Sequence, residues 1–523
     1  MSYNLDVETL RDSEYGKTYL DHGGTTLYAK SLVQEFAQDL LGNLYGNPHS
    51  ASTPSAIAGH RVDAVREKAL RFFGATPEHY DLIFVSNATA AIKLVTECVR
   101  DYISYENKKG KKKFWYGYHK DAHNSLVGVR EHATASRCFT SDDEVEDWIR
   151  LGMTGHSRDE VGLFSYPGQS NMTGRRLPLS WESSHGRTFT LLDAAALATT
   201  SPLDLSDPTA SPDFVSVSFY KIFGFPDIGA LIIRRAAGHL LQRRRYFGGG
   251  TIDMVIAVGG TSHVKRDSSL HDQLEDGTLP FHSIFALDIA IDVHARLFTS
   301  MARISGHTAF LASYLYDNLQ HLHHENGSSL LRIYTDDASS YGNPTLQGAT
   351  IAFNVYTAEG TLIPCQVIEK LADNEGIYIR SGSLCNPGGI ATYLGYTPED
   401  LKRAFALGNR CSKPLSDIDG NPTGVVRVSL GAMSTRQDVD TLVSFLVAKV
   451  LPIKGRDLVR NDDPILENLI GPDTVSLSED AKLTNPIKHV VVERVTAESP
   501  AELSPSGKSG RLARLFKIGR FKG

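Results

Sequence analysis

The sequence predicts an α/β protein with a large, mostly parallel sheet and a smaller α+β lobe. Apolar runs alternate with helical patterns between about residues 17 and 450, which is typical of this fold class. Several of the runs are apolar throughout, as expected of strands buried on both faces of a parallel sheet. With 523 residues, the chain can bury a large core.

The elements of the large sheet follow one another through the first 300 residues. Apolar residues recur at helical spacing in 88–102 and again in 283–300. We therefore assign residues 51–300 to a large domain. Its strands are expected at 82–86, 114–118, 161–166, 188–192, 214–218 and 230–233.

A second set of elements predicts a smaller C-terminal lobe at residues 301–452. A helical stretch at 307–322 precedes the expected strands of this lobe. The N-terminal segment, residues 1–50, is expected to join the same lobe. The strands are expected at 350–356, 377–380 and 425–430.

Residues 453–523 differ in composition from the rest of the chain. Prolines interrupt a polar stretch with few aromatics, so we expect this tail to be mostly disordered. Its last segment, 508–523, is basic and places Leu512, Leu515 and Phe516 at helical spacing. We interpret it as a solvated basic tail, and the alternative is a helix that makes weak contact with a membrane surface or a partner.

Composition argues against several function classes. The formal net charge of −6 is small for this length and argues against nucleic-acid or other polyanion binding. No run approaches the apolar length of a membrane span, and the N-terminus lacks the layout of a signal peptide. The five cysteines show neither zinc-ribbon nor redox-dithiol spacing, so no disulfide scaffold is expected. We therefore expect a cytoplasmic location.

Two other kinds of site are poorly supported. His321, His323, His324 and Glu325 could suggest a metal site, but they lie in a polar stretch and are expected to face solvent. The string GKS at 507–509 lacks the upstream glycine of a phosphate loop and lies in the tail. We expect no bound metal and no nucleotide.

Lys221 carries the most informative chemistry. It follows an apolar strand directly and precedes a turn rich in glycine and proline. Partial desolvation at such a strand end can lower the pKa of a lysine enough for Schiff-base formation. Asp193 ends another strand and could pair with a protonated pyridine nitrogen, or it could cap the next helix.

Two further features suggest a flat, phosphorylated ligand. Residues 84–91 run from a strand through small residues into a helix, whose first N–H groups can bind phosphate. His123 follows another strand and could stack on a flat ring, although a lone histidine is more often structural. Both depend on the surrounding motifs.

Taken together, these motifs resemble fold-type I pyridoxal-phosphate enzymes of the class V aminotransferase and cysteine desulfurase group. More narrowly, the chain resembles the N-terminal desulfurase portion of eukaryotic molybdenum cofactor sulfurases. The resemblance covers about residues 17 to 435. The strings that carry it are YLDHGGTTLY (19–28), YGNPHS (45–50), SNATAAIKLV (86–95), GQSNMTGRR (168–176), LLDAAALATTSPLDL (191–205), SFYKIFGFPDIGALI (218–232), YFGGGT (246–251), EDGTLPF (275–281), TIAFNV (350–355), RSGSLCNPGG (380–389) and PTGVVRVSLG (422–431).

The resemblance implies pyridoxal 5′-phosphate (PLP) as the cofactor and a role for each matching residue. Lys221 would form a Schiff base with the cofactor, Asp193 would pair with its pyridine nitrogen, and His123 would stack on its ring. Asn171 would lie near the phenolic oxygen and the substrate. The phosphate would be held by Thr89, Ala90, Ser218 and Tyr220.

Other matches concern the substrate and partners. Thr251 matches a family position that reaches the phosphate of the neighbouring subunit, which implies a homodimer. Arg427 matches the arginine that clamps the substrate carboxylate, and a planar bidentate donor suits that task. Full-length sulfurases carry a second, molybdopterin-binding domain, which residues 453–523 are too few and too polar to form. The sulfur acceptor is therefore expected on a separate chain.

Cys385 matches the persulfide-forming cysteine of the family. It lies between Gly382 and the string NPGG at 386–389, and a mobile glycine-rich loop would let its thiolate reach a bound substrate. The expected reaction converts L-cysteine to alanine and leaves a persulfide on Cys385. Cys98 and Cys365 lie in apolar helical patterns and are expected to be buried instead.

Departures from the family pattern leave the reaction open. Positions where relatives carry further cysteines or a glutamine read Ser383, Ile390 and Ala196, and the turn at 226–229 is one residue shorter. The first alternative is a PLP-dependent lyase, decarboxylase or aminotransferase acting on another amino acid, which would not need Cys385. The second is a non-catalytic scaffold. The retained residues that argue against a scaffold are Lys221, Asp193, His123 and Arg427.

Overall fold

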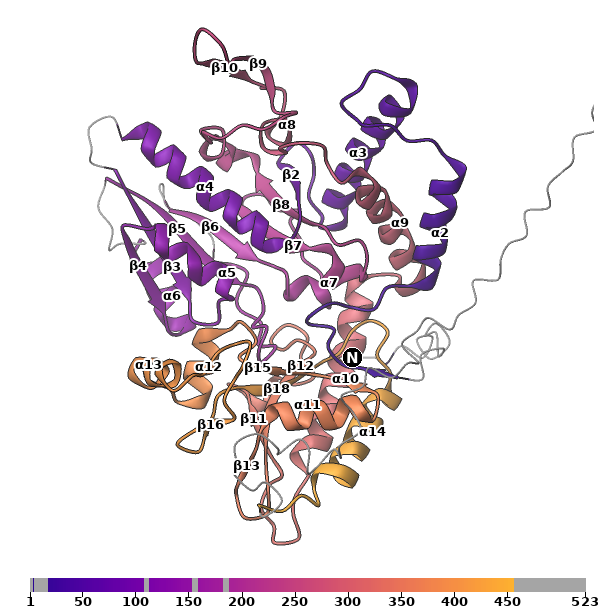
Figure 1. Cartoon of the computed structure of the whole chain (residues 1–523), viewed down its shortest axis with the longest axis vertical. Helices are drawn as coiled ribbons and strands as arrows, with labels where there is room; N and C mark the ends of the chain where they lie inside the picture. The colour runs from indigo at the N-terminus through magenta and orange to yellow at the C-terminus, as the bar shows by residue number, and fades with distance from the viewer. Residues whose placement is uncertain (1–2, 4–16, 108–111, 153–158, 182–187, 456–523) are drawn as a thin grey trace, which may run out of the picture. The chain divides into compact units, whose positions relative to one another are not determined.

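The computed structural model describes residues 3, 17–107, 112–152, 159–181 and 188–455. The described residues lie in one compact unit, which contains a seven-stranded and a five-stranded sheet (Figure 1). Apart from residues 453–455, the predicted tail lies outside the described residues. In the described part of the chain, no helix is both long and apolar enough to cross a membrane.

The large sheet has the strand order β2-β8-β7-β6-β5-β3-β4. Neighbouring strands are parallel, except that β8 runs antiparallel to both β2 and β7. This confirms the predicted mostly parallel sheet. Its strands are β2 (Tyr80–Val85), β3 (Lys113–His119), β4 (Ala135–Phe139), β5 (Glu160–Pro167), β6 (Thr188–Asp193), β7 (Phe214–Ser218) and β8 (Gly229–Arg234).

Strand β4 was not predicted from the sequence. It pairs with β3 alone, at the edge of the sheet, and only Phe139 of its five residues is buried. An edge strand of this kind has no apolar run to reveal it.

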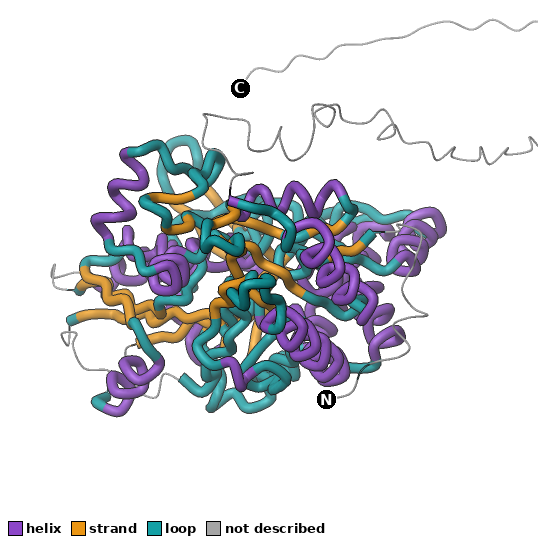
Figure 2. The backbone as a smooth tube through the Cα atoms, turned by 90° about the horizontal axis from the view of Figure 1, so that it is seen from below, coloured by secondary structure: helices purple, strands orange, loops and turns teal. Residues whose placement is uncertain are grey.

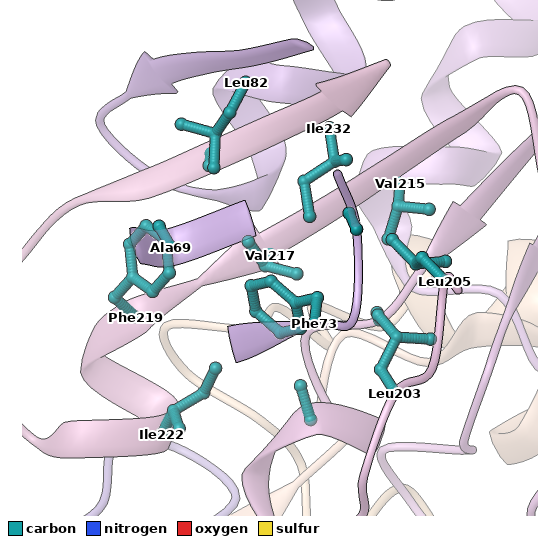
Figure 3. Packing of buried hydrophobic residues seen from close by; sticks show 14 of the residues in the cluster. Ala69, Phe73, Leu82, Leu203, Leu205, Val215, Val217, Phe219, Ile222 and Ile232 are labelled. Carbon is teal, nitrogen blue, oxygen red and sulfur yellow. The ribbon is translucent and has the colours of Figure 1, made fainter. Parts of the chain in front are cut away.

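Both faces of the large sheet are buried under helices (Figure 2). Leu82 and Ile232 pack on one face with residues of α3 and α9, as Figure 3 shows for Leu82, Ile232 and Ala69. Ile83, next to Leu82, points to the other face and joins a core with α4, because side chains alternate along a strand. Each such side chain contributes about 1.5–3 kcal/mol on burial. The covering helices include α2 (Lys30–Gly42), α3 (Thr53–Phe72), α4 (Ala88–Glu106) and α9 (Phe281–Phe298).

The second sheet is antiparallel and has the order β11-β12-β18-β15, with β13 also paired to β12. Helices α10 (Met301–Gln320), α11 (Cys365–Asn374) and α14 (Arg436–Phe445) contribute residues to its core. The strand expected at 377–380 is instead two short strands on either side of Ile379. The strands of this sheet are β11 (Leu331–Tyr334), β12 (Thr350–Tyr356), β13 (Leu362–Ile363), β15 (Arg380–Gly382) and β18 (Val425–Ser429), whereas β14 (Ile377–Tyr378) is not part of it.

The N-terminal segment contacts both sets of elements. Strand β1 (Thr18–Tyr19) pairs in parallel with β14, whereas α2 packs against α9 of the large sheet. The segment therefore spans the two lobes, and the predicted boundaries at residues 50, 300 and 452 stay predictions.

Candidate active site

Seven of the predicted site residues line one cavity of about 110 Å³. The cavity lies at the carboxyl ends of the parallel strands, where α/β proteins place ligands. Asp193 is the last residue of β6 and Ser218 the last of β7, and these strands pair side by side. The seven residues are Thr89, His123, Asn171, Asp193, Ser218, Tyr220 and Lys221.

Lys221 reaches the cavity from α7 (Phe219–Phe223), a short helix that follows β7 directly. The surrounding protein desolvates the amine and lowers the pKa of Lys221, while the nearby Asp193 carboxylate acts in the opposite direction. A lowered pKa leaves more of the amine neutral and nucleophilic. Asp193 is buried and its carboxylate accepts a hydrogen bond from the N–H of Ala195 at 3.0 Å.

The start of α4 forms another wall of the cavity. Asn87 caps this helix by accepting a hydrogen bond from the N–H of Ala90 at 3.0 Å, and the N–H of Ala88 donates to Ser218 Oγ at 3.0 Å. A 19-residue helix presents partial positive charge at this end. Gly229 lets β8 approach closely, since a Cβ there would lie 2.7 Å from Asn87 Cα.

Ser125 was missed by sequence reasoning but links two predicted residues. Its hydroxyl lies 2.7 Å from Thr89 Oγ1 and 3.0 Å from Nδ1 of His123, and its N–H donates to the same ring nitrogen at 3.2 Å. Burial lowers the pKa of His123, so the ring is held mainly neutral. Ser125 stands two residues after His123 in HNS, and a local hydrogen-bonding serine was the only available signal.

Arg427 forms an ion pair across 406 residues of sequence. It is buried on β18, its Nη2 lies 2.5 Å from Asp21 Oδ1, and its Nη1 donates to the backbone oxygen of Asn171 at 3.0 Å. Its Nε has no hydrogen-bond partner among the described residues. Arg380 lies 3.7 Å from the other oxygen of Asp21. Asp21 belongs to the quoted string YLDHGG but was given no role there.

Cys385 lies in a tight turn from Ser383 to Asn386. The N–H of Asn386 donates to the oxygen of Ser383 at 3.1 Å, and the central residues, Leu384 and Cys385, have φ of 56° and 54°. Positive φ at both central positions is typical of a type I′ turn and disfavours residues with a Cβ. The thiol is exposed, whereas Asn386 is fully buried.

Hydrogen bonds hold this turn beside the cavity. The N–H of Asn124, next to His123, donates to the oxygen of Cys385 at 2.9 Å, and Asn171 Nδ2 donates to the oxygen of Leu384 at 2.7 Å. Asn386 Nδ2 donates to Asn171 Oδ1 at 3.0 Å. Asn171 therefore joins the cavity, Arg427 and the cysteine turn. The backbone here is pinned, in contrast to the mobile loop expected from the glycines.

Two residues predicted to contact a cofactor phosphate, Ala90 and Thr251, do not line the cavity. Ala90 lines a neighbouring groove instead, and its N–H is used by the Asn87 cap. Thr251 is buried, and its hydroxyl donates to the oxygen of Gly248 at 2.9 Å. The roles given to both residues stay predictions.

The structure also shows how far two other cysteines and the histidine stretch are buried. Cys98 and Cys365 are buried as predicted, and burial raises the pKa of Cys365 to about 11. His321 and His323 are exposed, but the expectation that His324 faces solvent is wrong. It is buried because its Nε2 bonds to the backbone oxygen of Tyr356 at 2.9 Å. Among the described residues, no group of three or more potential metal ligands is present.

The residues of the cavity fit the cofactor expected from the sequence. A flat ring would find a carboxylate at Asp193 and a desolvated amine at Lys221, with a helix start for a phosphate beyond them. The buried, unpartnered Nε of Arg427, in the part of the chain described, leaves a donor for an anionic group nearby. A small amino acid bound to such a cofactor is compatible with this set of side chains.

Comparison with known proteins agrees with this geometry. The aminotransferase class-V family matches residues 18–442. A molybdenum cofactor sulfurase of Aspergillus fumigatus is 54% identical over 457 residues, which cover 85% of this chain and 53% of the relative. The chain thus spans about half the length of that curated relative.

Solved structures confirm the predicted fold class. The apo cysteine desulfurase from Thermococcus onnurineus has a TM-score of 0.64 at 18% identity, covering 85% of this chain and 98% of that one. A C-DES mutant with glycine covalently linked to its PLP cofactor has a TM-score of 0.56 at 15% identity, covering 84% and 99%.

Proposed function

The chain belongs to the class-V aminotransferase family, and from this premise we propose that it is a PLP-dependent cysteine desulfurase of the molybdenum cofactor sulfurase type. The observation that carries the proposal is that Asn171 bonds both to Arg427 and to the turn that bears Cys385, while its side chain lines the cavity with Lys221. A cofactor site, a carboxylate site and a thiol are thereby joined by one residue.

The cavity residues bind and orient the cofactor. Lys221 supplies the amine that links to it, Asp193 holds a proton on its ring nitrogen, and His123 packs against its ring. Thr89, Ser218 and Tyr220 line the same cavity as the start of α4 and are suited to the phosphate. PLP, when bound, acts as an electron sink for the substrate carbon.

Arg427 recognises the substrate carboxylate. Its buried guanidinium already lies beside Asn171, and a planar fork of N–H groups suits a carboxylate. Asp21 keeps this buried cation paired while the site is free. An α-amino acid offers both groups that these residues would recognise, a carboxylate for Arg427 and an amine for the cofactor at Lys221.

Cys385 accepts the sulfur. Its thiolate attacks the sulfur of L-cysteine, a new S–S bond forms, and the C–S bond of the substrate breaks with its electron pair going to carbon. The carbon takes up a proton, so the products are alanine and a Cys385 persulfide. The pinned backbone requires the thiol to reach the substrate by side-chain rotation or relaxation of the strained turn.

A lyase is the second candidate, and one observation favours it. Cys385 does not line the 110 Å³ cavity, so a reaction confined to that cavity would proceed without the thiol. Such an enzyme would release pyruvate and sulfide from L-cysteine rather than alanine.

We also propose a homodimer, in which a protruding hairpin contributes to the interface. The strands β9 (Ile252–Ile256) and β10 (Ser262–Lys265) follow Thr251. The hairpin exposes Val255 and Val264 on its strands by 52% and 49%, and Val258 in the connecting loop by 92%. Exposed apolar side chains in this number favour a partner surface.

All five cysteines are free, which supports the proposed cytoplasmic location. The sulfur acceptor is proposed to be a separate molecule.

Product analysis tests the function directly. Purified protein is supplied with PLP, L-cysteine and a reducing thiol, and alanine, pyruvate and sulfide are quantified for wild type and Cys385→Ser. Equal alanine and sulfide, both lost in Cys385→Ser, are the expected result. Pyruvate formation, or alanine formation that survives this substitution, would contradict the proposal.

A further inference from the structure

A second exposed thiol lies beside the turn that carries Cys385. Cys411 Sγ is 3.9 Å from Ser383 Oγ, and Ser383 is the first residue of that turn. Cys385 and Cys411 are both exposed. Cys98 and Cys365 are buried, and Cys138, although exposed, lies on β4 of the other sheet. Among the five cysteines, Cys411 is therefore the second exposed thiol at the turn that carries Cys385.

The geometry places the two thiols within reach of each other. Ser383 and Cys385 are two residues apart, and two residues span at most about 7 Å even when fully extended. The turn shortens this span, because the N–H of Asn386 bonds back to Ser383. Both thiols are exposed, and sulfur transfer between them requires the two side chains to rotate toward each other.

Cys411 is held in place by a hairpin of its own. The N–H of Arg410 donates to the oxygen of Lys413 at 3.2 Å, and the N–H of Lys413 donates to the oxygen of Arg410 at 3.1 Å. Cys411 and Ser412 form the tip. Arg410 fixes this hairpin to α13 (Pro398–Ala406), because its guanidinium carbon lies 3.6 Å from the centre of the Phe405 ring and its Nη1 donates to the oxygen of Phe405 at 2.6 Å.

We propose that Cys411 is a second sulfur carrier, which takes the terminal sulfur from the Cys385 persulfide and presents it to the acceptor. This inference rests on the proposed function. The Cys411 thiolate attacks the outer sulfur, a new S–S bond forms at Cys411, and the old S–S bond breaks to leave the Cys385 thiolate. One sulfur atom moves, and no external oxidant or reductant is needed.

Such a transfer separates two tasks. Cys385 lies in a turn tied to the cofactor cavity through Asn171, so a bulky acceptor would have to approach the substrate entrance. Cys411 lies at the tip of a hairpin of its own, so the proposed transfer moves the sulfur from the turn to a separate segment of the chain. Removal of sulfur from Cys385 also frees it for the next substrate.

The experiment follows sulfur in the full-length, PLP-loaded protein. A single equivalent of ³⁵S-labelled L-cysteine is added, thiols and persulfides are alkylated after increasing times, and peptides are separated and counted. Label is expected on Cys385 first and then on Cys411. Cys411→Ser should lose all label at that peptide and keep the first-turnover yield of alanine. Cys385→Ser should lose label at both, and Cys138→Ser serves as the matched control.

Several outcomes overturn the proposal. Label that stays on Cys385, that reaches Cys138 as readily as Cys411, or that reaches Cys411 in Cys385→Ser excludes this relay. A Cys385–Cys411 disulfide formed with release of sulfide also excludes it, since the inner sulfur would then be attacked. Absence of alanine shows instead that the proposed function has failed. Mild oxidation without substrate distinguishes that case, because close thiols still form the Cys385–Cys411 disulfide.

Discussion

The cofactor cavity and the Cys385 turn differ in burial and in backbone conformation. In the cavity, buried strand ends place Asp193, Ser218 and Lys221 around a desolvated space, where charge interactions are strong. The turn instead exposes its thiol and holds two side-chain-bearing residues at positive φ. Under the proposed function, the cofactor chemistry would take place in the buried cavity, whereas the sulfur would be passed to an acceptor outside it. Asn171 bonds to both sides of this division.

The largest effect is expected for Lys221→Ala. Comparison with Cys385→Ser would show whether the cavity and the turn act independently. Lys221→Ala should lower the rate of alanine formation roughly 10³-fold and abolish the visible absorbance of the PLP-loaded protein, because the linking amine is gone. Cys385→Ser should also stop alanine formation but keep the absorbance. Spectra and product assays of the two variants check this. An unchanged spectrum in Lys221→Ala would overturn the cofactor assignment.

Burial of His294 in the large lobe should also make the stability of the protein sensitive to acid. His294 packs among the rings of Phe72, Phe223 and Phe298, and burial lowers its pKa to about 4. The unfolded chain then binds a proton more readily than the folded protein does. The contribution of His294 to the free energy of unfolding is therefore complete above about pH 6.5 and is lost as the pH falls toward 4, by about 3 kcal/mol in total.

Urea unfolding at pH 7.5 and pH 4.5 measures this loss. His294→Leu should lose less stability than wild type between the two pH values, and Cys385→Ser should behave like wild type. If the two substitutions changed the acid response equally, burial of His294 would not be its cause.

A moderate effect is expected for a substitution at Arg427, which is proposed to bind the substrate carboxylate. Arg427→Lys keeps the charge but loses the fork of N–H groups, so kcat/KM for L-cysteine should fall about tenfold or more, corresponding to 1.5–3 kcal/mol for a charged hydrogen bond. Steady-state kinetics with L-cysteine measures the change. The PLP absorbance should be retained, and its loss would place Arg427 in cofactor binding instead.

The smallest effect would test the strain in the turn. Glycine adopts positive φ without the cost of about 1–2 kcal/mol that other residues meet, so Cys385→Gly should be more stable than Cys385→Ser by about 1 kcal/mol. Cys411 has no positive φ, so the same pair of substitutions there should favour serine. Urea unfolding of the four variants decides. Equal stability of the two Cys385 variants would mean that the turn is unstrained.

The sequence predicted what local patterns can encode. The fully apolar strands were found to within a few residues, and the residues at or just after the ends of β6 and β7 led to Asp193 and Lys221. The exposed edge strand β4 had no such pattern. The pairing of Asp21 with Arg427, the contact of Ser383 with Cys411 and the positive φ of Leu384 depend on tertiary packing. A glycine-rich string predicted mobility where buried Asn386 instead pins the chain.

The pairing of Asp21 with Arg427 has a consequence for synthesis of the protein. The two residues are 406 positions apart, and β1 pairs with β14 from the same distant part of the chain. A ribosome adds residues at about 5–20 per second, so at least about 20 seconds separate translation of the aspartate from that of the arginine. During this interval the elements of the large sheet have already been made. The proposed carboxylate site at Arg427 is therefore completed after every residue that lines the cofactor cavity has been made, so a nascent chain can form that cavity before Arg427 is available.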